Sequence, residues 1–148
     1  MTIIDEILNF AIDREEEAAA FYTELAGKAK QKHMADLLLS FAAEERGHKA
    51  KLLAVKGGKR LAPKPGKVMD LQIADYTVDV KPSANMRYED VLIVAMKNEK
   101  AAFRLYTDLA ATADDPETQQ TFLALAQEEA KHKLRFELEY DERVLQDN

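Results

Sequence analysis

The sequence predicts an all-α protein, a four-helix bundle made of two repeated antiparallel helical hairpins joined by a long crossover. Three observations lead to this prediction. The 148-residue chain is rich in helix-forming residues on both sides of one segment, 57–84, which holds three of the five glycines and three of the four prolines. Apolar residues recur at helical spacing in four stretches. The first half of the chain also matches the second half at a constant offset.

Two helices are expected on each side of this segment. We therefore predict a single domain over 1–148, with a first hairpin at 2–56, a connector at 57–84 and a second hairpin at 85–142. Four helices of about 20 residues would make a bundle about 30 Å long. The apolar positions that define the four helices are Ile4, Leu8, Ala11, Ile12, Ala18, Ala19, Tyr22 and Ala26; Met34, Leu38, Phe41 and Leu52; Tyr88, Leu92, Ala95, Ala102, Tyr106 and Leu109; and Phe122, Leu125, Phe136 and Tyr140.

Local signals mark the ends of these helices. Thr2, with Asp5 three residues later, is a plausible N-cap, and Gly27 is a reasonable C-terminal stop. Gly57-Gly58 ends the second helix. At 114–117 an Asp caps the fourth helix and Pro116 opens it, and Asp114 and Glu117 have capping-box spacing. In the connector, 68–73 is compatible with a short helical turn, while 76–80 alternates like an extended strand.

The composition excludes several kinds of function. Lys and Arg total 21 and Asp and Glu total 27, a net charge of −6 that argues against nucleic acid or an anionic membrane as the main partner. The absence of cysteine excludes disulfides, a thiolate nucleophile, a zinc finger and cysteine-ligated iron–sulfur centres. No apolar run approaches the roughly 20 residues needed to span a bilayer, and no signal peptide is readable. We expect a cytoplasmic protein.

An internal repeat gives the strongest signal. At an offset of 84, residues 2–55 align with 86–139 without a gap, with 15 identities in 54 positions. Each half then has a Glu on its first helix and a Glu-x-x-His on its second. Glu15, Glu45 and His48 align with Glu99, Glu129 and His132.

Helical periodicity predicts that these six residues point inward. Glu15 lies on the apolar stripe, seven residues before Tyr22, whereas Glu16 and Glu17 turn away from it. Glu45 and His48 share one face, at i and i+3, in the gap between Phe41 and Leu52. The second half repeats the arrangement.

Four carboxylates buried together need a positive charge among them. Two divalent cations would balance their charge, and carboxylate with imidazole suits Fe, Mn or Zn better than Ca or Mg. Two alternatives stay open. In the first, the ligands are Glu44 and His48, at i and i+4, with Glu128 as the equivalent of Glu44 in the second half. In the second, the repeated charges are surface relics of a duplication, in which case they should lie outside the apolar stripes. His33 aligns with Glu117 and is expected on the surface.

Tyr22 and Tyr106 are aligned aromatic residues seven positions after Glu15 and Glu99. Because seven residues span about 10 Å of helix, each ring must lean to approach a metal. Core packing, with the hydroxyl bonded to a buried acceptor, is one interpretation. A redox role, or support of a ligand carboxylate, is the other.

This pattern, a Glu and a Glu-x-x-His repeated once across four helices, resembles the ferritin-like di-iron carboxylate proteins, and most closely the rubrerythrin group. The resemblance covers nearly the whole chain outside the connector and implies a ferritin-like bundle with two Fe ions. Carried over to this sequence, Glu15 and Glu99 would be terminal ligands and Glu45 and Glu129 would bridge the metals. His48 and His132 would each complete the coordination of one iron ion.

The resemblance also implies a function, which is reduction of peroxide or dioxygen with electrons from an external donor. The sequence departs from rubrerythrins proper in two ways. It has no paired cysteines of a rubredoxin domain, and Met96 and Ala102 stand where a further carboxylate is usual three residues from Glu99. The alternative is therefore an iron-binding or ferroxidase protein that handles Fe²⁺. A homodimer is expected, since the long connector could exchange between subunits.

Overall fold

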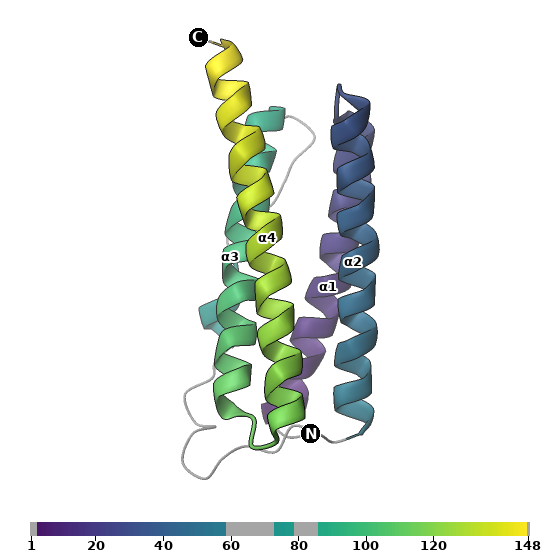
Figure 1. Cartoon of the computed structure of the whole chain (residues 1–148), viewed down its shortest axis with the longest axis vertical. Coiled ribbons are helices and arrows are strands. Elements are labelled where there is room, and N and C mark those ends of the chain that lie inside the picture. The colour runs from purple at the N-terminus through teal and green to yellow at the C-terminus, as the bar shows by residue number, and fades with distance from the viewer. Residues whose placement is uncertain (1–2, 59–72, 79–85, 148) are drawn as a thin grey trace. The chain divides into compact units, whose positions relative to one another are not determined.

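The computed structural model describes residues 3–58, 73–78 and 86–147. Four long helices account for most of them: α1 (Ile3–Lys28), α2 (Lys32–Gly57), α3 (Tyr88–Thr112) and α4 (Pro116–Asp147), with a short 3-10 helix, η2 (Ile73–Tyr76), between α2 and α3 (Figure 1). The described ranges contain no strand. The predicted all-α class is therefore confirmed.

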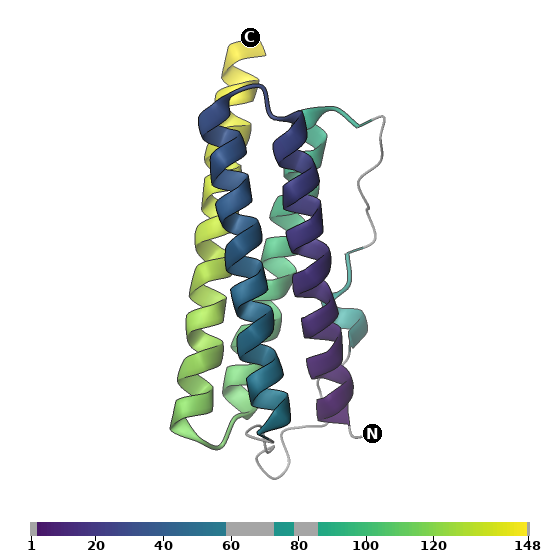
Figure 2. The ribbon, with the colours of Figure 1, turned by 90° about the vertical axis from the view of Figure 1, so that its right-hand side faces the viewer.

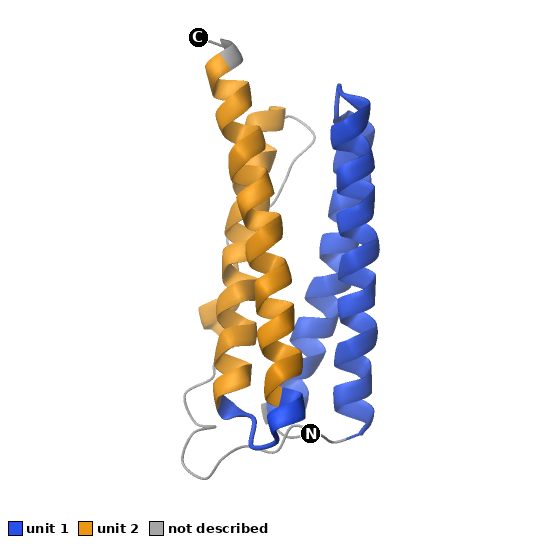
Figure 3. Cartoon of the chain, in the orientation of Figure 1, with its two compact units in different colours: residues 1–70, 112–118 blue, residues 71–111, 119–148 orange. Residues whose placement is uncertain are grey.

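The chain divides into two compact units, which Figure 3 shows in different colours. Unit 1 comprises residues 1–70 and 112–118, and unit 2 comprises residues 71–111 and 119–148. In unit 1, α1 and α2 run antiparallel side by side, as Figures 1 and 2 both show. In unit 2, α3 and α4 form the second antiparallel hairpin. Each half of the repeat is thus one hairpin.

The helices are longer than predicted. α1 and α2 have 26 residues each, α3 has 25 and α4 has 32. α1 continues one residue past the expected stop at Gly27, to Lys28. α2 ends at Gly57 as predicted, where the Gly58 amide donates to the Ala54 carbonyl over 2.9 Å. α4 continues beyond the predicted hairpin end at 142, to Asp147.

α4 begins with an Asp cap followed by Pro116, as predicted, but the capping residue and its partner differ from the predicted pair. Asp115 caps the helix, since its Oδ2 accepts hydrogen bonds from the Thr118 amide at 3.0 Å and the Thr118 hydroxyl at 2.8 Å. The predicted capping-box pair, Asp114 and Glu117, is therefore one residue out of register. Pro116 sits at the first helical position, where its missing N–H costs nothing.

The extended strand predicted at 76–80 is not found at its first residue, Tyr76, which lies in a 3-10 helix. Tyr76 ends η2, where its ring is buried and its hydroxyl bonds Asp108, and the Thr77 hydroxyl closes the turn onto the Ala74 carbonyl at 3.0 Å. The local Thr77 bond favours a turn over an extended segment. Residues 79–80, residues 68–72 of the helical turn predicted at 68–73, and the Thr2 cap lie outside the described residues, and Ile73 is the first residue of η2.

Burial confirms nearly all predicted core positions. Every predicted apolar position in α1 and α2 is buried, as are those in α3 and α4 except Tyr88 and Tyr140, which are half-buried. Glu139 is buried beside Tyr140, with 5% of its surface exposed. Near its C-terminal end, α4 therefore turns a different face inward from the one predicted.

Candidate metal centre

Unit 1 brings together the three polar residues that the sequence predicted on its inner faces. Glu15 comes from the middle of α1, and Glu45 and His48 come from consecutive turns of α2; we call these three triad 1. Both carboxylates are fully buried and the histidine is 4% exposed. One ligand atom from each member lies within 4.8 Å of the others. Helix pairing within the hairpin thus assembles three donors in one place.

Unit 2 contains the matching set, which we call triad 2: Glu99 from α3, and Glu129 and His132 from α4. Its carboxylates are fully buried and its histidine is 1% exposed. One ligand atom from each member again lies within 4.8 Å of the others. The repeat therefore preserves the arrangement as well as the residue types.

The imidazole–carboxylate separations fit a shared cation better than hydrogen bonds. His48 Nδ1 lies 3.6 Å from Glu15 Oε2 and 3.5 Å from Glu45 Oε1. His132 Nδ1 lies 3.8 Å from Glu99 Oε2 and 4.0 Å from Glu129 Oε1. These distances are long for hydrogen bonds. Two ligands at about 2.1 Å from one transition-metal ion stand roughly 3–4 Å apart, so both triads match the spacing of a metal's ligands.

Arg14 adds a positive charge to triad 1 that the sequence analysis missed. Its Nη1 donates to Glu15 Oε1 at 3.0 Å and to Glu45 Oε2 at 3.5 Å, and its side chain is only 12% exposed. Each carboxylate thus turns one oxygen toward Arg14 and the other toward His48. The contact with Glu45 joins residues 31 positions apart, so the periodicity of one helix carries no signal for it.

Burial confirms the predicted helix faces, and the choice of Glu45 and Glu129 over Glu44 and Glu128 as ligands stays a prediction. Glu16 and Glu17 are exposed, and Glu16 pairs with Lys49 on the surface at 3.3 Å. Glu44 is exposed and Glu128 is 37% exposed, whereas the neighbours of both in triads 1 and 2 are fully buried. The role of the triads as metal ligands stays a prediction.

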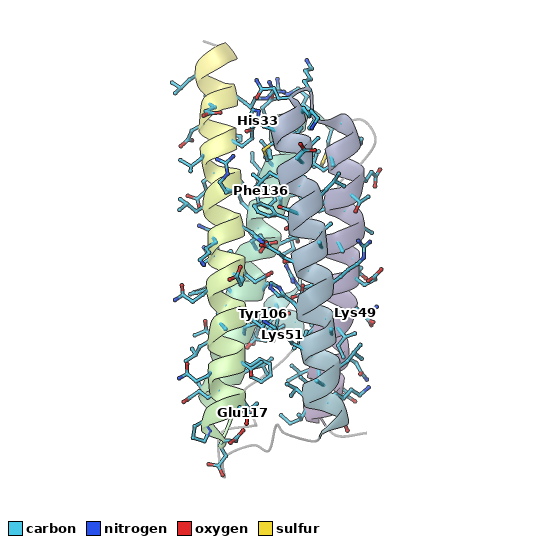
Figure 4. All side chains as sticks on the ribbon, turned by 45° about the vertical axis from the view of Figure 1, so that its right-hand side comes forward. His33, Lys49, Lys51, Tyr106, Glu117 and Phe136 are labelled. Carbon is cyan, nitrogen blue, oxygen red and sulfur yellow. The ribbon has the colours of Figure 1, made fainter. Side chains whose placement is uncertain are left out.

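The two predicted tyrosines are fully buried. The Tyr22 ring packs edge-on against Phe41, with ring centres 6.4 Å apart. Tyr106, labelled in Figure 4, stacks on Phe122 at the same distance and an angle of 20°. This packing supports the core interpretation of both residues. His33 is exposed near the start of α2, as predicted (Figure 4).

Glu139 is a buried acidic residue that the repeat did not predict, since its aligned position is Val55. It lies in unit 2 with half-buried Tyr88, and Arg143 stands over the Tyr88 ring, 4.9 Å from its centre. Arg143 Nε is also 4.0 Å from Glu89 Oε1. This group ties the start of α3 to α4.

Comparison with known proteins agrees with this geometry. The family model of Rubrerythrin matches residues 6–140. The chain belongs to the Rubrerythrin family. A solved structure, "Hypothetical Protein Pfu-1136390-001" from Pyrococcus furiosus, is similar to this Rubrerythrin family member with a TM-score of 0.76 and 27% identity, over 92% of this chain and 87% of the other. A search of curated proteins gives no match.

These findings confirm the ferritin-like four-helix fold class predicted from the sequence. Family membership and the buried Glu and His side chains together indicate a metal site. Among the described residues, no helix combines the length and apolar character that a membrane span requires.

Proposed function

We propose that this Rubrerythrin family member is a di-iron carboxylate oxidoreductase that reduces peroxide or dioxygen, with triads 1 and 2 together holding two Fe ions. The repeated, fully buried Glu/His triad is the observation that carries the proposal. Carboxylates without exposure to water are costly to keep ionised unless cations balance them. The same donors accept Mn or Zn, so the choice of iron rests on the family.

Each residue of the triads has a distinct task in this proposal. Glu15 and Glu99 would be terminal carboxylate ligands, Glu45 and Glu129 would be shared by the two ions, and His48 and His132 would each complete the coordination of one ion. When bound, two ferrous ions supply the two electrons that cleave the O–O bond of peroxide. The chain itself fixes the donors on rigid helices and keeps bulk water from them, which sets geometry and access.

Tyr22 and Tyr106 support this arrangement by packing in each hairpin, and we include them as candidate residues acting near the ligands. Their rings are fully buried at the same position of the repeat. In this proposal an external donor supplies the electrons for repeated turnover.

A second candidate function is iron binding with ferroxidase activity. Met96 and Ala102, three residues on either side of Glu99, provide no further carboxylate in this part of α3. A site limited to six protein ligands suits Fe²⁺ oxidation without movement of an ion between ligands. The net charge of −6 attracts cations in either case.

Metal content of matched variants tests the proposed site. Glu45→Ala and Glu129→Ala should each lower the metal bound per chain at both positions, because both residues are bridging ligands. Glu16→Ala and Glu17→Ala, which change exposed residues on the same helix as Glu15, should leave about two ions per chain. Equal losses in all four variants would contradict the ligand assignment.

Two reactions of the iron-loaded protein separate the candidate functions. Rapid oxidation of the reduced protein by peroxide, followed by repeated turnover with a chemical reductant, supports the oxidoreductase. Many Fe²⁺ ions oxidised per chain, with ferric product retained, supports the ferroxidase. Two tightly bound zinc ions and no redox response would contradict both.

A further inference from the structure

We propose that Arg14 is a positioning residue of the metal site, and that its guanidinium takes the place of a metal ion between Glu15 and Glu45 in the metal-free protein. When the site is loaded, the guanidinium keeps its hold on Glu15 and gives up Glu45. The inference rests on the proposed function and adds to it a residue that prepares two of the ligands. All the contacts that carry it lie within unit 1.

Arg14 supplies a positive charge where two buried carboxylates need one. Glu15 and Glu45 are fully buried, and keeping both ionised at this depth is costly unless a cation is close. Arg14 Nη1 contacts both of them. Its side chain is only 12% exposed, so water screens its charge poorly, and arginine keeps that charge at every working pH. The metal-free fold therefore has a cation of its own at this place.

The two contacts of Arg14 differ in length. Nη1 lies 3.0 Å from Glu15 Oε1, an ordinary hydrogen-bond distance, and 3.5 Å from Glu45 Oε2, which is longer than most hydrogen bonds. Glu15 is thus held firmly and Glu45 loosely. This difference matches the proposed tasks of the two residues, because a terminal ligand needs one oxygen, whereas a ligand shared by two ions needs both.

The other oxygen of each carboxylate faces His48. Glu15 Oε2 lies 3.6 Å from His48 Nδ1, and Glu45 Oε1 lies 3.5 Å from it. An ion bound on this side would take one oxygen from each glutamate and leave the contact between Arg14 and Glu15 Oε1 in place. Of the two oxygens that Arg14 contacts, Glu45 Oε2 alone then has to change partner before two ions share Glu45. Arg14 acts through the carboxylates and is not itself a ligand.

A double-mutant cycle on the metal-free protein tests the role of Arg14 as a counter-cation. Arg14→Met should lower the urea midpoint by about 1 M, because it removes one partner of a buried charge group. The same substitution should cost much less in a Glu45→Gln background, where one of the negative charges is already gone. Glu16 and Lys49 give the matched control, since they also pair across α1 and α2, at 3.3 Å, but on the surface. Glu16→Gln and Lys49→Gln should show little coupling.

Urea titrations with saturating Co²⁺ under anaerobic conditions test the exchange between guanidinium and metal. A bound ion supplies the positive charge that Arg14→Met removes, so this variant should lose clearly less stability with Co²⁺ than without it. Arg14→Lys keeps the charge and should lose less than Arg14→Met in the metal-free protein. Equal losses of Arg14→Met in the two conditions would overturn the exchange.

The visible absorption of bound Co²⁺ provides a readout that a purely structural role of Arg14 would not change. In Arg14→Met, Glu15 Oε1 is released from the guanidinium and can bind the ion together with Oε2. The higher coordination number should weaken the absorption per bound ion relative to the wild type, whereas Lys49→Gln should leave it unchanged. An unchanged spectrum in Arg14→Met would overturn the hold on Glu15.

The results also separate this inference from the proposed function. A wild type that binds Co²⁺, with an Arg14→Met loss that is the same in the Glu45→Gln background, would overturn the role of Arg14 and leave the metal site standing. A wild type that binds no Co²⁺ would overturn the proposed site and the exchange with it. If Arg14→Met does not fold without metal, Arg14→Gln takes its place in the same cycle.

Discussion

The Tyr76 hydroxyl donates a hydrogen bond to Asp108 Oδ2 over 2.6 Å. Tyr76 ends η2 and Asp108 lies on α3, so the bond fixes the described segment of the connector to the first helix of unit 2. Only 5% of Tyr76 is exposed, which means that the ring is buried along with its polar end. Burial and the Asp108 carboxylate both raise the pKa of Tyr76 above its usual value of 10. The phenol therefore stays protonated and keeps donating.

Tyr76→Phe should lower the free energy of unfolding by about 1–2 kcal/mol at neutral pH, because it removes a hydrogen bond to a charged acceptor and retains the ring. Urea denaturation measures the change. Thr77→Ala removes a hydroxyl bonded to the Ala74 carbonyl in the same turn, but at an exposed position, and should cost less. Equal losses in the two variants would contradict a special role for the Tyr76–Asp108 bond.

In contrast to Tyr76→Phe, Tyr88→Phe should leave the free energy of unfolding unchanged or raise it at neutral pH. The Tyr88 hydroxyl is buried and makes no hydrogen bond to any residue that the structure describes, whereas the ring keeps its contact with Arg143 in the Phe variant. Removing an unsatisfied buried hydroxyl is neutral or stabilising. Urea midpoints of wild type and variant at pH 7 measure the effect, and a clear loss of stability would indicate a hydroxyl partner.

The stability of the Tyr88→Phe variant should also differ from that of the wild type in its dependence on alkaline pH. Burial, reinforced by Glu139 and opposed by Arg143, raises the pKa of Tyr88 to about 12. Because the folded pKa lies above the unfolded value of about 10, the neutral phenol stabilises the fold fully below pH 10, and this contribution is lost as pH rises toward 12. Wild-type stability should fall over that range, and Tyr88→Phe should reduce the fall. Denaturation curves at pH 9 and pH 11 test this.

Asp115→Ala should destabilise the protein by about 1 kcal/mol, since it removes the cap of α4 and leaves the Thr118 amide and hydroxyl without their shared acceptor. Asp114→Ala is the matched control, because Asp114 is an exposed neighbour in the same turn. Thermal unfolding of both variants measures the difference. A larger effect at Asp114 would favour the capping-box pair that the sequence predicted.

Helix faces could be predicted from the sequence because a helix rotates about 100° per residue, which fixes side-chain directions within each element. For this reason the sequence predicted correctly that Glu45 is buried and Glu44 exposed, and that Glu15 is buried and Glu16 exposed. The repeat strengthened the prediction by giving the same answer at Glu99 and in the second Glu-x-x-His motif. Local periodicity therefore suffices for burial along single helices.

Contacts between distant residues could not be predicted in the same way. Arg14 meets Glu45 across two helices, and Tyr76 finds Asp108 at a separation of 32 residues. Neither pair follows from the pattern of one element. Glu139 was missed because its aligned position, Val55, is apolar, so the repeat predicted no buried charge at the end of α4.

The buried carboxylates lead to a last prediction, on stability with and without metal. A dication that binds only the folded state raises its stability, by about 2.7 kcal/mol at a concentration one hundred times the dissociation constant. Adding Co²⁺ should therefore raise the melting temperature, and a chelator should reverse the rise. Glu129→Gln should shrink the rise by removing one ligand charge. It should also make the metal-free protein more stable than the metal-free wild type, because it removes a fully buried negative charge while retaining an amide oxygen.

Glu16→Gln is the control for this pair of effects. Glu16 is exposed, and its substitution removes the same charge from the chain as Glu129→Gln does. Its melting temperature should match the wild type both with and without Co²⁺. A Glu129→Gln protein that is less stable without metal and still gains as much from Co²⁺ would mean that Glu129 serves packing and hydrogen bonding. The predicted combination, greater stability without metal and a smaller gain with it, is expected only where the fold holds a carboxylate in place for a cation.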